Sequence, residues 1–124
     1  MAKSIMLVDD SATMRKIIMR TIRAAGLSLG DIQEAGDGGE ALEKIAQTPV
    51  DIVLCDVNMP GMGGTEFVEK LRSDSAYDST KVVMVSTESA DDFISSVLAL
   101  GANGYIKKPF TPESIQQTLE PFMG

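Results

Sequence analysis

The segment from residue 50 to residue 61 constrains the fold of this chain more than any other segment. It contains an apolar run from Ile52 to Cys55 that is too short for a helix and too uniformly apolar for a strand with one solvent-exposed face. The run therefore predicts a central strand of a parallel sheet, covered on both faces. An acid, Asp56, follows it, and the chain then turns at residues 59–61. We expect this strand to carry a carboxylate to the edge of the sheet at which α/β proteins bind ligands.

Four further segments predict strands, and a helical pattern follows each strand. The other candidate strands are residues 4–8, 31–35, 81–85 and 104–106. Apolar residues at three- and four-residue spacing predict helices between the strands and after the last one. The candidate residues for capping helix N-termini are Ser11, Asp37, Ser89 and Thr111. Glu40 follows Asp37 at the spacing of a capping box, whereas residues 73–80 are polar and predict a loop.

Five strands that alternate with five helices predict an α/β fold, because each crossover helix must return the chain to a parallel sheet. The expected architecture is a five-stranded doubly wound parallel sheet with helices on both faces. The chain has 124 residues, too few for the eight strand–helix units of a barrel. Neither a linker nor a repeat interrupts the alternation, so we expect a single domain over residues 1–124.

The composition excludes several classes of function. The chain has no histidine, which rules out histidine acid–base chemistry and imidazole metal ligands. The net charge of −7 argues against nucleic-acid binding, which needs a basic surface. We find neither a signal peptide nor an apolar segment of membrane-spanning length, so we expect a cytoplasmic protein without a membrane partner. The single cysteine, Cys55, is expected to be a buried apolar residue of the central strand.

Polar residues stand at the ends of four of the predicted strands. They are Asp9 and Asp10 after the first, Asp56 after the third, Ser86 after the fourth and Lys108 after the fifth. Each alone has an ordinary explanation, such as a helix cap, a turn serine or a surface lysine. The exits of parallel strands share one edge of the sheet, however, so we expect the five side chains to converge there.

Three carboxylates at one edge need a counter-charge at neutral pH. An all-oxygen ligand set with some coordination left to water suits Mg²⁺. Lys108 adds a positive charge and Ser86 a hydroxyl donor. An aspartate can act as the nucleophile toward a phosphoryl group, whose charge the metal, the lysine and the hydroxyl would neutralise. The combination therefore predicts a site that receives a phosphoryl group.

Five motifs in this pattern resemble the receiver domain of two-component response regulators. They are Leu7-Val8-Asp9-Asp10-Ser11, Glu34-Ala35-Gly36-Asp37-Gly38, Asp56-Val57-Asn58-Met59-Pro60-Gly61, Val85-Ser86 and Lys108-Pro109-Phe110. The resemblance runs from the first strand to the last helix and implies a flavodoxin-like sheet with strand order 2-1-3-4-5. Within that family, the chain is most similar to the stand-alone chemotaxis regulators. This closer resemblance rests on residues 10–15 and on the expected lack of an output domain.

The resemblance also implies a role for each site residue. Asp56 would accept the phosphoryl group from a histidine kinase, and Mg²⁺ would be held by Asp9, Asp10, Asp56 and the backbone carbonyl of Asn58. Lys108 would contact the phosphoryl group, with a cis bond to Pro109. Ser86 would then move to bond a phosphoryl oxygen, and Tyr105 would rotate into the space vacated. Asn58 and Glu88 would flank the phosphoryl group and set how fast it hydrolyses, which predicts a short-lived phosphorylated state.

The implied output surface comprises the fourth helix, the fifth strand and the fifth helix, with Ile94, Tyr105 and Lys107. The implied partners are a chemotaxis histidine kinase, a flagellar motor switch protein and a dedicated phosphatase, and the expected state is a monomer. The acidic residues 91–92 differ from the more basic character of enteric chemotaxis regulators, which leaves the identity of the motor partner and of the phosphatase open. The basic side chains of the first helix, Arg15 among them, are expected to face solvent.

Three alternatives remain beside this interpretation, in which the only catalysis is self-phosphorylation and dephosphorylation. A stand-alone receiver could act as a phosphate sink or relay without motor output. A haloacid-dehalogenase-like phosphatase also uses an aspartate nucleophile and Mg²⁺, but it needs a second acid two residues later, where this chain has Asn58. A flavin carrier would need a loop rich in Ser, Thr and Gly after the first strand, where this chain has Asp9 and Asp10.

Overall fold

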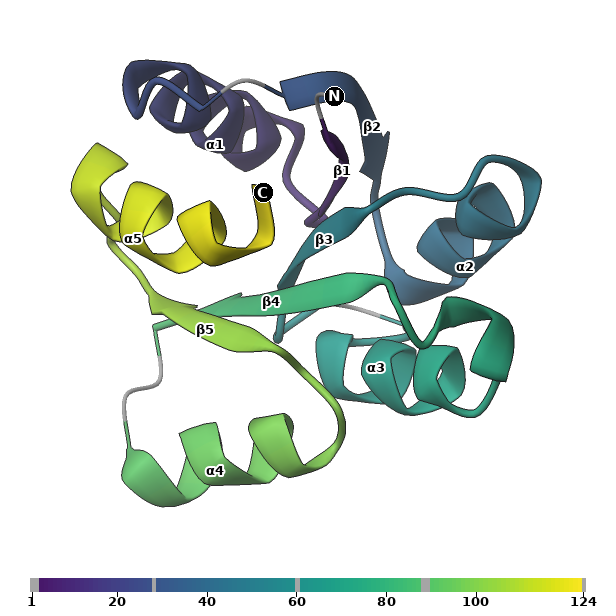
Figure 1. The fold of residues 1–124 in the computed structure, drawn as a ribbon. Coiled ribbons are helices and arrows are strands. Elements are labelled where there is room, and N and C mark those ends of the chain that lie inside the picture. Colours follow the sequence, from purple (N-terminus) through teal and green to yellow (C-terminus); the bar gives the residue numbers. More distant parts are fainter. Residues whose placement is uncertain (1–2, 28, 60, 88–89, 124) are drawn as a thin grey trace.

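A five-stranded parallel sheet forms the centre of the computed structural model, which describes residues 3–27, 29–59, 61–87 and 90–123 (Figure 1). The strands are β1 (Lys3–Val8), β2 (Leu29–Ala35), β3 (Ile52–Asp56), β4 (Lys81–Ser86) and β5 (Gly104–Lys107). Their order is β2-β1-β3-β4-β5, which confirms the order implied by the resemblance. Every pairing is parallel. All the strands therefore end at the same edge of the sheet.

Helices cover both faces of this sheet. They are α1 (Ala12–Ala24), α2 (Gly38–Gln47), α3 (Gly64–Arg72), α4 (Asp91–Ala99) and α5 (Pro112–Met123). Figure 1 shows α1 and α5 together on one face, with α2, α3 and α4 on the other. Two apolar cores separate the layers accordingly. One contains Ile18 of α1 and Ile115 of α5, and the other contains Phe67 of α3 and Val97 of α4.

The central strand β3 connects the two cores. All five of its residues are buried, and it pairs with β1 on one side and β4 on the other. Successive side chains of a strand point to opposite faces, so Ile52 and Leu54 enter one core while Val53 and Cys55 enter the other. Cys55 is fully buried, as predicted, and this burial raises the pKa of its thiol far above the usual range. The strand ends in Asp56, which is its one charged residue.

Three of the predicted helix caps are present in the structure. The side chains of Ser11 and Asp37 accept hydrogen bonds from the N–H groups three residues later, and Thr111 does the same at the start of α5. The capping box of α2 is displaced by one residue, because the Glu40 carboxylate accepts from the N–H of Gly36 (2.8 Å) and not from that of Asp37. This bond is the main reason that the pKa of Glu40 lies below its ordinary value. It also joins the end of β2 to the first turn of α2.

Some element boundaries differ from the prediction. The N-cap of α4 is Ala90, so the assignment of this position to Ser89 is wrong; Ser89 itself lies outside the described residues. Asp91 and Asp92 occupy the first turn of α4, where their charges interact favourably with the helix dipole without a side-chain cap. A short 3₁₀ helix, η1 (Ser75–Tyr77), lies within the predicted loop, and β2 begins two residues earlier than predicted. No helix in the described ranges is both long enough and apolar enough to span a membrane.

Gly64 allows α3 to begin directly against the end of β3. Its N–H donates to the carbonyl of Val57 (3.0 Å). A Cβ at this position would lie 2.5 Å from the carbonyl oxygen of Asp56 and 2.7 Å from the terminal methyl group of Met84. The backbone that carries Asp56 therefore leaves no room for a side chain here.

We expect Gly64→Ala to lower the free energy of unfolding by roughly 2 kcal/mol, because a backbone atom of β3 or the whole of α3 must shift. Urea unfolding monitored by circular dichroism measures this loss. Gly36→Ala is the matched control, since a Cβ there meets the flexible end of Glu40 at the ordinary distance of 3.4 Å. Equal midpoints for the two variants would contradict the expectation.

Candidate functional site

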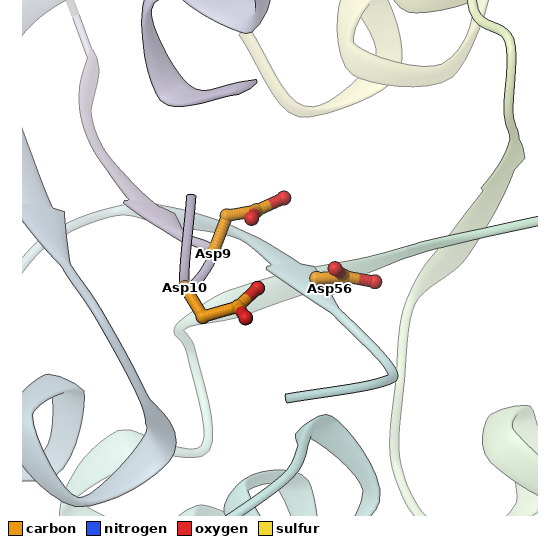
Figure 2. Close-up of side chains that lie close together, drawn as sticks. All are labelled: Asp9, Asp10 and Asp56. Carbon is orange, nitrogen blue, oxygen red and sulfur yellow. The ribbon is translucent and has the colours of Figure 1, made fainter. Parts of the chain in front are cut away.

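The ends of β1 and β3 bring three carboxylates together. Asp9 and Asp10 follow β1 directly, and Asp56 is the last residue of β3. One carboxylate oxygen from each residue lies within 4.8 Å of the other two. Figure 2 shows the three side chains gathered around a common space at the sheet edge. The structure thus places together the acids that the sequence located at separate strand exits.

Lys108 supplies positive charge to this acid cluster (Asp9, Asp10 and Asp56). Its ammonium nitrogen lies 3.3 Å from Oδ2 of Asp56 and 3.7 Å from Oδ2 of Asp9. The side chain is mostly shielded from water, so the pairing is screened less than a surface ion pair. The backbone N–H of Lys108 donates to the carbonyl of Ser86 (2.7 Å), which fixes the end of β5 against the end of β4. The Lys108–Pro109 bond is cis, as the resemblance implied.

Asp9 has a buried carboxylate oxygen without a hydrogen bond. The residue is only 2 % exposed. Its Oδ1 accepts from the N–H of Ser11 (2.9 Å), whereas Oδ2 has no hydrogen-bond partner among the described residues. Burial raises the pKa of Asp9, and the charges of Asp56 and Asp10 add to this effect against the opposing Ser11 hydrogen bond and Lys108. A buried, unsatisfied oxygen that faces two further carboxylates fits a hard divalent cation.

Asp56 is held in place yet remains reachable. The residue is 9 % exposed, and its Oδ1 accepts a 3.3 Å hydrogen bond from the N–H of Asn58. Its Oδ2 faces Lys108. Asn58 lies in an exposed loop directly after β3. This geometry orients one carboxylate oxygen of Asp56 toward the same space as the acids of β1, which is the arrangement that a nucleophile beside a metal requires.

Two further predicted site residues, Ser86 and Tyr105, lie on β4 and β5. Ser86 is buried at the end of β4, one strand away from Asp56. Tyr105 is half-buried on β5, and its ring makes an edge-to-face contact with Phe93 of α4, with ring centres 6.4 Å apart. Glu88 lies outside the described residues, so the structure says nothing of its position. The functional roles assigned to these residues remain predictions.

Two contacts near the acid cluster were not expected from the sequence. Arg15 was predicted to face solvent, but its side chain is only 18 % exposed and it donates to the backbone carbonyl of Asp9 and to the carboxylate of Glu34. The prediction was wrong because helical periodicity places Arg15 off the apolar face of α1 without showing that β2 passes beside it. The available signal was an acid, Glu34, one residue before the end of the strand that neighbours β1.

Comparisons with known proteins agree with this geometry. A model of the response regulator receiver domain matches residues 5–120. The chain is 40% identical to chemotaxis protein CheY1 of Helicobacter pylori (strain ATCC 700392 / 26695) over 121 residues, which are 97% of this chain and 96% of that protein. It is 38% identical to a chemotaxis protein CheY homolog of Campylobacter jejuni, covering 97% and 92% of the two chains. The structure of chemotaxis response regulator CheY4 of Vibrio cholerae superposes with a TM-score of 0.86 at 36% identity, covering 99% and 100%.

We expect Asp9→Asn to stabilise the metal-free protein at pH 7. A carboxyl group whose pKa is raised in the folded state binds its proton more tightly there than in the unfolded chain, so its charged form costs stability above that pKa. Asparagine keeps an oxygen for the Ser11 N–H and removes the buried charge. The melting temperature in EDTA should rise by about 4 °C, corresponding to roughly 1 kcal/mol.

The stabilisation should shrink as the pH falls through the raised pKa of folded Asp9, and it should disappear below the ordinary aspartate value of 3.8, because both folded and unfolded chains then carry a protonated Asp9. The control is Asp31→Asn, which removes an exposed carboxylate of β2 and changes the net charge equally. If both variants shift the melting temperature by the same amount, the burial of Asp9 is not the cause.

Proposed function

The chain belongs to the response regulator receiver family, and from this premise we propose that it is a phosphorylation-activated regulator in which Asp56 accepts a phosphoryl group from a histidine kinase. The observation that carries the proposal is the position of Asp56, between two further carboxylates and the ammonium group of Lys108 at the end of a fully buried strand. The chain is a signalling receiver, and its own phosphorylation and dephosphorylation are the only chemistry that we assign to it.

The proposed metal is Mg²⁺, held by the carboxylates of the acid cluster and by the backbone carbonyl of Asn58. The Asp9 oxygen that lacks a hydrogen bond supports a cation that prefers oxygen, and so does the fact that the described residues place only carboxylate ligands at the cluster. When bound, the ion neutralises part of the charge on the phosphoryl oxygens.

The placement of Asp56 and Lys108 supports the following transfer step. A carboxylate oxygen of Asp56 attacks the phosphorus of the phosphorylated kinase histidine, the P–N bond breaks, and its electron pair stays on the imidazole nitrogen. The ammonium group of Lys108, 3.3 Å from Oδ2 of Asp56, offsets negative charge on the transferring group. In the later hydrolysis, a water oxygen attacks the phosphorus, the bond between the phosphorus and the Asp56 oxygen breaks, and inorganic phosphate leaves while the carboxylate of Asp56 is restored. We propose that Asn58 and Glu88 orient that water.

Phosphorylation would alter the output surface through Ser86 and Tyr105. Ser86 bonds a phosphoryl oxygen in the proposed active state, which draws the end of β4 toward the site, and Tyr105 rotates inward behind it. The edge-to-face contact of Tyr105 with Phe93 connects this residue to α4. We propose that the surface of α4, β5 and α5, with Ile94 and Lys107, then binds a flagellar motor switch protein. The chemotaxis names of the relatives support this partner.

An apolar pocket beside the acid cluster supports docking of the kinase. It has a volume of about 380 Å³ and is lined by Met14, Ile17, Thr87, Lys108, Pro109 and Phe110. Ile17 is 41% exposed and adds apolar surface to this pocket. We propose that this surface accepts the kinase segment that bears the phosphohistidine, while the chain acts as a monomer of one receiver domain.

The phosphate sink or relay remains the second candidate function, since it uses the same site without the motor partner. A phosphatase that acts on separate substrates is disfavoured by Asn58, because an amide in an exposed loop cannot serve as the second acid that such an enzyme needs.

We expect acetyl phosphate to label the wild-type protein in the presence of Mg²⁺ but not in EDTA, and we expect Asp56→Asn to abolish the labelling. Intact-protein mass spectrometry measures the added phosphoryl group. Asp31→Asn serves as the control and should label normally, because its carboxylate is exposed on β2. Labelling that persists in Asp56→Asn would move the acceptor to another residue, and a folded wild type that never labels would overturn the proposal.

We expect the double substitution Asn58→Lys and Glu88→Lys to lengthen the lifetime of the phosphorylated state by roughly tenfold, because neither lysine can orient or deprotonate the attacking water as the native pair would. The decay of the label after removal of the phosphodonor gives the rate constant. An unchanged decay rate would show that these two positions do not control hydrolysis.

A further inference from the structure

We propose that Arg15 is a positioning residue for the acid cluster, which holds the turn between β1 and α1 so that Asp9 presents Oδ2 to a divalent cation. The inference rests on the proposed function, because it assigns Arg15 a part in binding Mg²⁺. Arg15 lies in the first turn of α1 and is not one of the proposed metal ligands.

Three of the four polar atoms of Asp9 make hydrogen bonds, and the fourth, Oδ2, lies 3.7 Å from the ammonium nitrogen of Lys108. Its N–H donates to the carbonyl of Ala35 on β2 (3.1 Å), and its Oδ1 accepts from the N–H of Ser11 (2.9 Å). Its backbone carbonyl accepts from Nη1 of Arg15. Only Oδ2 has no hydrogen bond among the described residues. The hydrogen bonds to the N–H, the carbonyl and Oδ1 of Asp9 therefore fix the direction in which Oδ2 points.

Of these three hydrogen-bond partners of Asp9, Arg15 is the one that uses its side chain. A second contact holds its guanidinium group in place. Nε of Arg15 donates to Oε1 of Glu34 at 2.9 Å. Because a guanidinium group is planar, a donor on one edge bound to Glu34 limits the direction in which Nη1 can point. Glu34 lies on β2, directly beside Leu7 of β1. The Arg15 side chain thus spans from α1 to β2 across the end of β1.

Glu34 is held from the other side of β2. Lys44 of α2 donates to the backbone carbonyl of Glu34 and forms an ion pair with Glu40 at 2.9 Å. The carboxylate of Glu40 also accepts from the N–H of Gly36. The end of β2 is therefore tied to α2 while its Glu34 side chain holds Arg15. This arrangement gives Arg15 a fixed support on an element that carries none of the three acids.

Positioning and simple electrostatics predict opposite effects of removing Arg15. A guanidinium group close to a cation site repels the cation, so its loss alone should tighten Mg²⁺ binding. Loss of a contact that fixes a ligand should weaken binding, typically by 10- to 100-fold when a supporting residue is removed from a metal site. The sign of the change in Mg²⁺ affinity therefore distinguishes a positioning role of Arg15 from a purely electrostatic one.

The test is isothermal titration calorimetry with MgCl₂ on EDTA-treated protein at constant ionic strength. We expect Arg15→Ala to weaken Mg²⁺ binding by roughly tenfold. Lys16→Ala is the matched control, since it removes one positive charge from an exposed position on the same helix and should leave the affinity unchanged or slightly tighter. Arg15→Lys keeps the charge but loses the planar two-sided contact, so we expect several-fold weaker binding. Melting curves in EDTA establish that each variant is folded.

The outcomes separate this inference from the proposed function. Wild-type binding with equal affinities for Arg15→Ala and Lys16→Ala, or tighter binding by Arg15→Ala, would overturn the role of Arg15 and leave the metal site intact. If Arg15→Ala does not fold, an unchanged affinity in Arg15→Lys would overturn it equally. A folded wild type that binds no Mg²⁺ would overturn the metal site itself, and with it this inference.

Discussion

Three carboxylates lie together at one edge of the sheet, and the ammonium group of Lys108 pairs with only two of them, Asp9 and Asp56. This excess of negative charge is the constraint on which the site depends. The raised pKa of Asp9 reflects the cost of holding its negative charge in this place. That cost arises first from burial and then from the neighbouring acids. Such a cluster is stable when a cation joins it. The metal ion that we propose for this edge, together with Lys108, would offset the negative charge of the acids and of the phosphoryl group that we propose Asp56 accepts.

The scaffold holds the acid cluster in place because the backbone that carries the acids is packed against neighbouring elements. β3 is covered on both faces, so Asp56 leaves the core in one direction only. Gly64 brings the start of α3 against the carbonyl of Asp56, and the turn that carries Asp9 is bonded to β2 and α1. Rigid support of this kind pre-organises the acids before any ligand arrives, which is how proteins make charged sites effective.

A structural change at the acid cluster can reach the rest of the molecule through backbone contacts as well as through side chains. The hydrogen bond from the Lys108 N–H to the Ser86 carbonyl joins the exits of β4 and β5, so a shift of either strand end affects the other. Tyr105 lies on β5 in contact with Phe93 of α4. A small displacement at the site therefore has a short path to the surface that we propose binds the partner.

The sequence by itself determined the five strands, their alternation with helices and the acids at one edge, because apolar runs, caps and strand exits are local patterns and parallel strands end together. It did not reveal the Ala90 cap of α4, nor that Arg15 turns from solvent to bind Asp9 and Glu34. Tertiary structure alone decided which oxygen of Asp9 is left without a hydrogen bond among the described residues. The reason is physical, because these contacts join separate elements, α1, β1 and β2. The direction of a side chain between elements is set by packing rather than by sequence spacing.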